Sequence, residues 1–171
     1  EKMKGMDILI INTGGPEKNS FENVSTEQWE VDFQSLWMSS VDGIKESIKF
    51  MKENDWGRII LISSIAAKEP LDGLTTSNGL RAGLSGLCKS ISNEVAHYGI
   101  TLNIVCPGYT NTERLQSLNL KQEVIEKLVP AGRLGDPNEI ADLVTYLSSK
   151  RAGYITGQQI SVDGGSLKGH Y

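Results

Sequence analysis

A serine and an arginine stand four residues apart near the middle of the chain, at Ser77 and Arg81. Residues with this spacing share one face of a helix, so a hydroxyl would lie beside a permanently charged guanidinium. The arginine could bind ribose hydroxyls or a carboxylate. Neither group suits proton transfer at neutral pH, because an aliphatic hydroxyl is a far weaker acid than a phenol. Two interpretations are open: the pair lines a ligand site, or it belongs to an ordinary helix surface.

Three apolar segments end in polar or turn-forming residues. They are Ile8–Ile11 before Asn12-Thr13-Gly14-Gly15-Pro16, Gly57–Ser63 with Ser63-Ser64 at its end, and Leu102–Val105 before Cys106-Pro107-Gly108. Short continuous apolar runs indicate parallel strands that are buried on both faces. The carboxyl ends of such strands share one edge of the sheet, where ligands bind. We therefore expect Asn12, Ser64 and Pro107 to lie along a ligand-binding edge.

Two long helical patterns separate these strands, from Ser25 to Lys52 and from Thr75 to Tyr98, and Gly99 is placed to end the second. A further helix is capped at Asp136, and a last strand covers Gln159–Val162. Alternating strands and helices predict an α/β fold with a doubly wound, mainly parallel, Rossmann-like sheet.

Three glycines interrupt the second helical pattern, at Gly79, Gly83 and Gly86. Each costs a helix about 1 kcal/mol relative to alanine. We therefore expect a closely packed neighbour along that face of the helix.

A length of 171 residues fits one domain, residues 1–171. No Gly-rich turn precedes Ile8–Ile11, which is typical of the later part of such a domain, and we expect its first βαβ portion to be absent from this chain. Complete α/β domains of this kind often have about 200 to 250 residues.

Composition argues against several classes of partner. The net charge is −4 and no basic stripe lies on an expected helix, so nucleic acid is a poor partner. No apolar run reaches the roughly 18 to 20 residues that span a bilayer, and the first residues do not resemble a signal peptide, so we expect a cytoplasmic protein without membrane association. Cys88 and Cys106 lack metal-site spacing, which predicts reduced core thiols and no metal.

Four segments in order resemble the short-chain dehydrogenase/reductase family. They are Asp7–Gly14, Gly57–Ser64, Pro107–Thr112, and Tyr154–Gly157 together with Val162–Gly165. Among family members, the sequences of these segments are most similar to those of 3-oxoacyl-[acyl-carrier-protein] reductases, which reduce a β-keto thioester with a nicotinamide cofactor. The resemblance implies NADP or NAD as cofactor and a small-molecule or acyl-thioester substrate.

The resemblance also implies roles for particular residues. Ser64 matches the serine that contacts the substrate oxygen, although it could be a plain strand-end serine. The implied cofactor contacts are Asn12, Gly14, Pro107, Gly108 and Thr112. The family's catalytic tyrosine, lysine and asparagine positions are occupied here by Ser77, Arg81 and Leu36.

These departures leave two functions open: a nicotinamide-dependent oxidoreductase that reduces a carbonyl, or a non-catalytic homologue that senses a ligand or holds an oligomer together. Tyr109 is an alternative phenol, or else a packing aromatic. Residues 113–130 correspond to the family's mobile substrate lid, or form a surface helix without a role. The two long helices correspond to those that pack subunits in the family, which implies a homodimer or homotetramer with Trp37, Met38 and Leu87 as interface candidates.

Overall fold

A computed structural model describes residues 5–169 and contains one parallel sheet, with the strands in the order β1-β2-β3-β4. The strands are β1 (Ile8–Ile11), β2 (Gly57–Ile62), β3 (Ile100–Pro107) and β4 (Gln159–Val162). The register pairs Ile10 with Ile60, Ile60 with Asn103, and Val105 with Ile160. The predicted doubly wound parallel sheet is confirmed.

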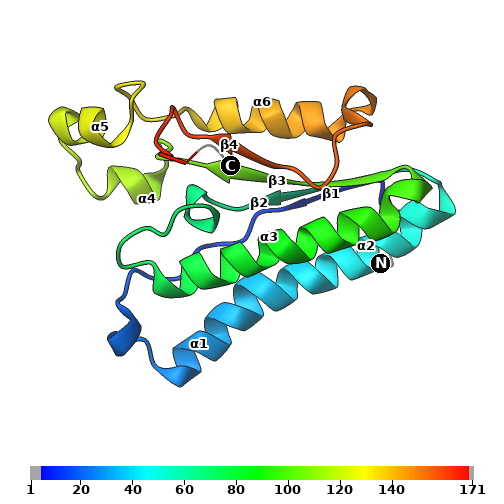
Figure 1. Cartoon of the computed structure of the whole chain (residues 1–171), viewed down its shortest axis with the longest axis horizontal. Helices are drawn as coiled ribbons and strands as arrows, with labels where there is room; N and C mark the ends of the chain where they lie inside the picture. Colours follow the sequence, from blue (N-terminus) through cyan, green and yellow to red (C-terminus); the bar gives the residue numbers. More distant parts are fainter. Residues whose placement is uncertain (1–4, 170–171) are drawn as a thin grey trace.

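Helices cover both faces of this sheet (Figure 1). The α-helices are α1 (Thr26–Asp32), α2 (Ser39–Glu53), α3 (Thr75–Val95), α4 (Glu113–Gln116), α5 (Gln122–Leu128) and α6 (Pro137–Ser148). Figure 1 shows α2 and α3 against one face and α6 against the other, with α4 and α5 beyond one end of the sheet. None of the helices in residues 5–169 is long and apolar enough to cross a membrane.

Each face of the sheet has its own hydrophobic cluster. Ile59 and Leu61 of β2 pack with Leu84 of α3, whereas Ile60, one residue away, packs with Leu147 of α6. Alternate residues of a strand point to opposite faces, so a continuous apolar run such as β2 serves both clusters. Because β2 and β3 are buried on both faces, the carboxyl ends of these two strands are held rigidly.

The prediction that Ile8–Ile11 is buried on both faces is wrong. Ile11 is buried, but Ile8 and Ile10 are 44% and 49% exposed. Leu9 and Ile11 face the helices, as shown by their packing in the cluster with α2 and α3. The α6 side of β1 has no such cover among residues 5–169, because β1 is the edge of this sheet and α6 packs on β2 and β3.

The first long helix begins as expected, with the Ser25 hydroxyl accepting from the Gln28 N–H at 3.2 Å. A π-helical segment, Phe33–Met38, separates α1 from α2. Leu36 lies in this segment and is 1% exposed within the core. The position that the resemblance assigns to an asparagine is therefore an apolar contact of the core.

The helix glycines of α3 do not share one environment. A Cβ at Gly83 would lie 2.7 Å from Cζ3 of Trp37, whereas a Cβ at Gly79 or Gly86 would meet no heavy atom within 4 Å. Within residues 5–169 the expected close neighbour is present at Gly83 and absent at the other two glycines. Trp37 packs there because the π-helical segment lies against α3.

This difference predicts opposite effects of two similar substitutions. Gly86→Ala should raise the free energy of unfolding by about 1 kcal/mol, because alanine is the better helix former. Gly83→Ala should lower it, because the new methyl group overlaps the Trp37 ring. Urea unfolding of both variants at equal protein concentration measures the difference. A loss of stability in Gly86→Ala would contradict the prediction and would place that glycine in a subunit contact.

Candidate active site

A pocket of about 700 Å³ lies beyond the carboxyl ends of β2 and β3. Its walls come from the loop after β1, the loop between β2 and α3, the first turns of α3, the end of β3, and α4. Among the residues that line it are Ser64, Ser77, Arg81, Pro107, Gly108 and Thr112. Six of the eight residues singled out from the sequence thus surround one cavity.

Ser64 is the second residue after β2 and is half-buried. Its hydroxyl oxygen accepts a hydrogen bond from the Ala66 N–H at 3.1 Å and so caps the short 3₁₀ turn Ile65–Ala67. An accepting hydroxyl keeps its own hydrogen free to donate. Ser64 can therefore present one donor to an oxygen atom in the pocket.

Ser77 and Arg81 are both buried, at 5% and 7% exposure. The Arg81 Nε donates to Ser77 Oγ at 3.1 Å, as expected for residues four apart on one face of α3. Both line the pocket, so they do not form an ordinary helix surface. Burial lowers the pKa of Arg81, and the nearby charge of Arg114 lowers it further, while the Cys106 sulfur acts in the opposite direction. Arginine nevertheless stays charged at neutral pH.

The turn after β3 forms another wall. Gly108 packs so tightly that a Cβ would lie 2.7 Å from Asp163 Cα, and its N–H donates to Val162 O at 3.0 Å. This contact fixes the Pro107–Gly108 backbone against the residues that follow β4. Thr112 opens α4 without a side-chain capping bond. Tyr109 also lines the pocket, so both interpretations of this phenol stay open.

Asn12 and Gly14 do not line this pocket. Asn12 follows β1 directly and is exposed, and a Cβ at Gly14 would meet nothing within 4 Å. Their neighbour Gly15 does reach the cavity. Their predicted role as cofactor contacts stays a prediction.

Arg114 is a site residue that reasoning from the sequence missed. It lies on α4, and its Nη2 donates to Pro16 O at 3.2 Å, which links α4 to the loop after β1 across the pocket. Residues 113–130 form α4 and α5, and their polar pattern carries no motif that marks this arginine. Only the approach of α4 to the β1 loop makes it part of the site.

Ser63 is a second residue of this kind. It lines the same pocket and is 9% exposed, and its hydroxyl has no hydrogen-bond partner among residues 5–169. A buried hydroxyl without a partner is unusual in proteins. Its position directly before Ser64 adds a further polar group to this wall.

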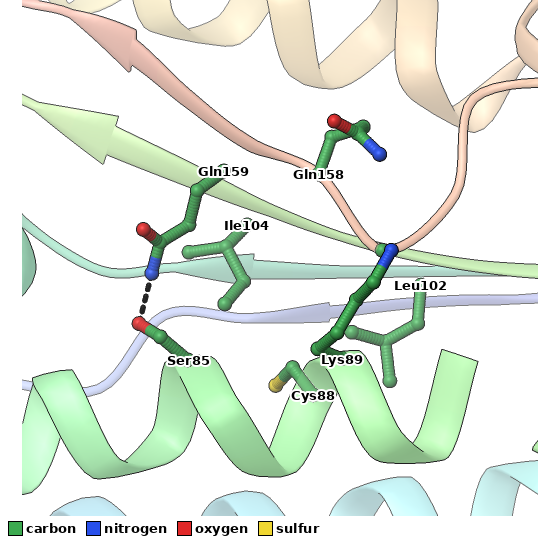
Figure 2. A pocket seen from close by; sticks show the side chains of 8 residues that line it. Ser85, Cys88, Lys89, Leu102, Ile104, Gln158 and Gln159 are labelled. Atoms are coloured by element: carbon green, nitrogen blue, oxygen red, sulfur yellow. Dashed lines mark hydrogen bonds between the residues drawn. The ribbon is translucent and has the colours of Figure 1, made fainter. Parts of the chain in front are cut away.

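A smaller pocket of about 210 Å³ lies between α3 and the sheet (Figure 2). Figure 2 shows Ser85, Cys88 and Lys89 of α3 facing Leu102 and Ile104 of β3, with a hydrogen bond from Gln159 to Ser85. Ser85 stands two helical turns beyond Ser77, a rise of about 12 Å. No site residue predicted from the sequence lines this pocket, so we place the candidate active site at the larger one.

Both cysteines are buried thiols, and we expect them to be unreactive in the native protein. Burial raises the pKa of Cys88 to about 12. Burial also raises the pKa of Cys106, although the charges of Lys68 and Arg81 act in the opposite direction. Only thiolates react readily, so Ellman's reagent at pH 8 should detect no thiol in the native protein and two per chain in guanidinium chloride. Glutathione in the same buffer is the positive control, and a fast-reacting native thiol would contradict the prediction.

Comparison with known proteins assigns the family. The model described as Enoyl-(Acyl carrier protein) reductase matches residues 1–166. The chain is 35% identical to the NADPH-dependent reductase BacG of Bacillus subtilis, and the match covers 95% of this chain and 68% of that protein. The chain belongs to the short-chain dehydrogenase/reductase family. Another relative, the 3-oxoacyl-[acyl-carrier-protein] reductase FabG of Rickettsia felis, is 38% identical over 97% of this chain and 69% of its own length.

Solved structures of the family have the same fold. YwfH, described as an NADPH-dependent reductase involved in bacilysin biosynthesis, superposes with a TM-score of 0.93 at 36% identity, covering 96% of this chain and 68% of that one. ElxO with NADP bound superposes with a TM-score of 0.88 at 26% identity, covering 95% of this chain and 68% of its own. Family membership makes the chain a relative of NAD(P)-dependent oxidoreductases with a Rossmann-like sheet.

Proposed function

We propose that this protein is an NADPH- or NADH-dependent reductase of a carbonyl group, similar to 3-oxoacyl-[acyl-carrier-protein] reductases. One observation carries the proposal: Ser64, Ser77 and Arg81 line a single pocket at the carboxyl ends of the strands. The relatives named as reductases of 3-oxoacyl-[acyl-carrier-protein] and acetoacetyl-CoA support the reaction class. NADPH is the preferred cofactor in this proposal, since BacG is named as NADPH-dependent and ElxO holds NADP.

The residues at the sheet edge fit a nucleotide cofactor. Three glycines lie at this edge. A Cβ added to Gly14 would meet no heavy atom within 4 Å among residues 5–169, and Gly15 and Gly108 belong to the pocket wall. Such bare backbone permits the close approach of a flat ligand. Gly14, Pro107, Gly108 and Thr112 would hold the cofactor, which supplies a hydride to the carbonyl carbon when bound.

The protein's own groups would act on the oxygen of that carbonyl. Ser64 donates its hydroxyl hydrogen to the oxygen, and the charge of Arg81 stabilises the alkoxide that forms when the C=O π pair moves onto oxygen. The alkoxide then takes a proton from a water molecule, which leaves as hydroxide, because the hydroxyl of Ser77 is too weak an acid for this role. Ser77, which accepts a hydrogen bond from Arg81 Nε, would instead hold the guanidinium in place. Without a phenol at this position we expect slower turnover than in relatives that have one.

The second candidate function is a non-catalytic homologue that senses a ligand or organises an oligomer. It is favoured by the replacement of the tyrosine and lysine by Ser77 and Arg81, and by the burial of Leu36 in the core. In this case the pocket would bind a ligand without turnover. A binding measurement alone therefore does not separate the two functions, and a turnover assay must accompany it.

The test is calorimetric titration of the full-length protein with NADPH and NADH, for the wild type and Arg81→Ala. Micromolar binding that the substitution weakens, together with cofactor oxidation in the presence of a β-keto thioester or a free β-oxo acid, supports the reductase. Binding without turnover supports the sensing homologue. The absence of heat with both cofactors contradicts the reductase and favours a structural or sensing homologue.

We also propose a cytoplasmic homodimer or homotetramer that assembles through the faces of α2 and α3. Support comes from the partly exposed aromatic pair Phe33 and Trp37, whose ring centroids lie 5.8 Å apart, and from the open space beside Gly79. Exposed aromatic surface beside small residues suits a helix-to-helix contact. Multi-angle light scattering tests the assembly, and a monomer would contradict it.

A further inference from the structure

The wall of the larger pocket carries positive charge that the described part of the chain does not neutralise. Lys18, Arg81 and Arg114 line it, against the single carboxylate of Asp72, in a chain whose net charge is −4. Across residues 5–169 the ion pairs lie elsewhere, on α2 and at the start of α6. Neither arginine therefore has a carboxylate at ion-pair distance within those residues. Arg81 is buried, whereas Lys18 and Arg114 are exposed. An unpaired buried charge such as that of Arg81 is costly, so a site of this kind favours an anionic ligand.

Arg81 and Arg114 approach the same point from two elements. A Cβ on Gly15 would lie 3.5 Å from Arg81 Nη2 and 3.3 Å from Arg114 Nη1, so the missing side chain leaves the space between them open. Arg81 uses Nε to bind Ser77, and its two terminal nitrogens have no acceptor among residues 5–169. Arg114 already donates to Pro16 O, and to Gly15 O at the longer distance of 3.5 Å.

We propose that Arg81 and Arg114 together bind the carboxylate of the substrate, so that the preferred substrate is a free oxo acid rather than a neutral ester or thioester. Guanidinium groups match the planar carboxylate and bind it through paired N–H donors. Ser64 lines the same cavity and is available for the carbonyl oxygen of the same molecule. The substrate class rests on the proposed reductase function, whereas the anion site itself does not.

A turnover assay separates the substrate class from the reaction. Acetoacetate is compared with two neutral counterparts, methyl acetoacetate and the N-acetylcysteamine thioester of acetoacetate. We expect Arg114→Gln to raise KM for acetoacetate by about 10-fold to 100-fold, the effect of losing a hydrogen bond between charged groups. The KM values for the ester, the thioester and NADPH should stay within about threefold. Arg114→Lys should recover part of the loss, because it keeps the charge without the planar fork.

Arg151→Gln is the matched control, since Arg151 is an exposed arginine outside the pocket. This substitution should leave kcat and the KM values for all substrates and for NADPH unchanged. If the wild type reduces the thioester as well as acetoacetate and Arg114→Gln changes neither, the inference is overturned while the reductase function stands. A rise confined to the KM for NADPH also overturns it, because the anion would then be a phosphate of the cofactor.

A binding measurement decides the inference even if the protein reduces none of these compounds. Calorimetric titration with acetoacetate should give heat in the wild type and in Arg151→Gln, but not in Arg114→Gln, and methyl acetoacetate should give none. That result supports the carboxylate site. If the protein also reduces none of these compounds, the proposed reductase function is contradicted and the carboxylate site is not. Equal binding of acid and ester, or no binding of acetoacetate at millimolar concentration, overturns the inference.

Discussion

Replacing Ser64 with alanine is expected to lower kcat of carbonyl reduction by about 100-fold or more, with little change in the cofactor affinity. Loss of one donor to a developing oxyanion costs roughly 100-fold to 1000-fold in other enzymes. Ser64 is placed for this role because its oxygen accepts from the Ala66 N–H, which leaves its hydrogen for the substrate. Steady-state oxidation of NADPH measures the effect.

Ser90→Ala is the control for this substitution. Ser90 lies on α3, is exposed, and donates to the carbonyl of Gly86 in its own helix. The kcat of Ser90→Ala should equal that of the wild type, and circular dichroism should show that both variants are folded. If Ser64→Ala retained a kcat within threefold of the wild type, the hydroxyl would not contact the reacting oxygen.

Gly99→Ala is expected to lower the free energy of unfolding by about 3 kcal/mol or more, which corresponds to a melting temperature lower by roughly 10 °C. Gly99 has φ +68°, a left-handed conformation that ends the helix at Tyr98. A Cβ there would also lie 2.5 Å from the backbone oxygen of Asp55. Neither the backbone of Gly99 nor that of Asp55 can move without disturbing the fold. The energies of the backbone strain and of the steric overlap therefore add together.

Gly132→Ala isolates the conformational part of that cost. Gly132 has φ +71°, but a Cβ there would meet no heavy atom within 4 Å. It should lose only about 1 to 2 kcal/mol, the cost of a left-handed conformation for an L-residue. Thermal unfolding by calorimetry compares the two variants. Equal losses would show that the contact with Asp55 contributes nothing.

Local signals in the sequence were sufficient for most of the fold. The apolar run of β2, the cap at Asp136 and the stop at Gly99 each depend on neighbouring residues, and each is present in the structure. The burial of β1 failed because exposure of Ile8 and Ile10 depends on which strand is the sheet edge. The π-helical turn between α1 and α2 had no signal in the apolar spacing.

Part of the candidate site was predicted because it, too, depends on local signals in the sequence. Ser64, Ser77 and Arg81 could be found because strand ends and helix spacing are short-range features. Arg114 could not be found, since it reaches the pocket only through the packing of α4 against the loop after β1. Asn12 and Gly14 were expected at the site but line none of its wall, because the chain bends into the pocket only at Gly15.

The exposed side of β1 affects how the assembly should be measured. Within residues 5–169, one edge of β1 pairs with β2 and the other has no partner strand, and the apolar side chains of Ile8 and Ile10 stand beside that free edge. Unpaired strand edges with apolar side chains are templates for strand addition between molecules. A preparation of these residues alone can therefore associate through β1, so a mass above that of a monomer would not by itself identify assembly through the helices.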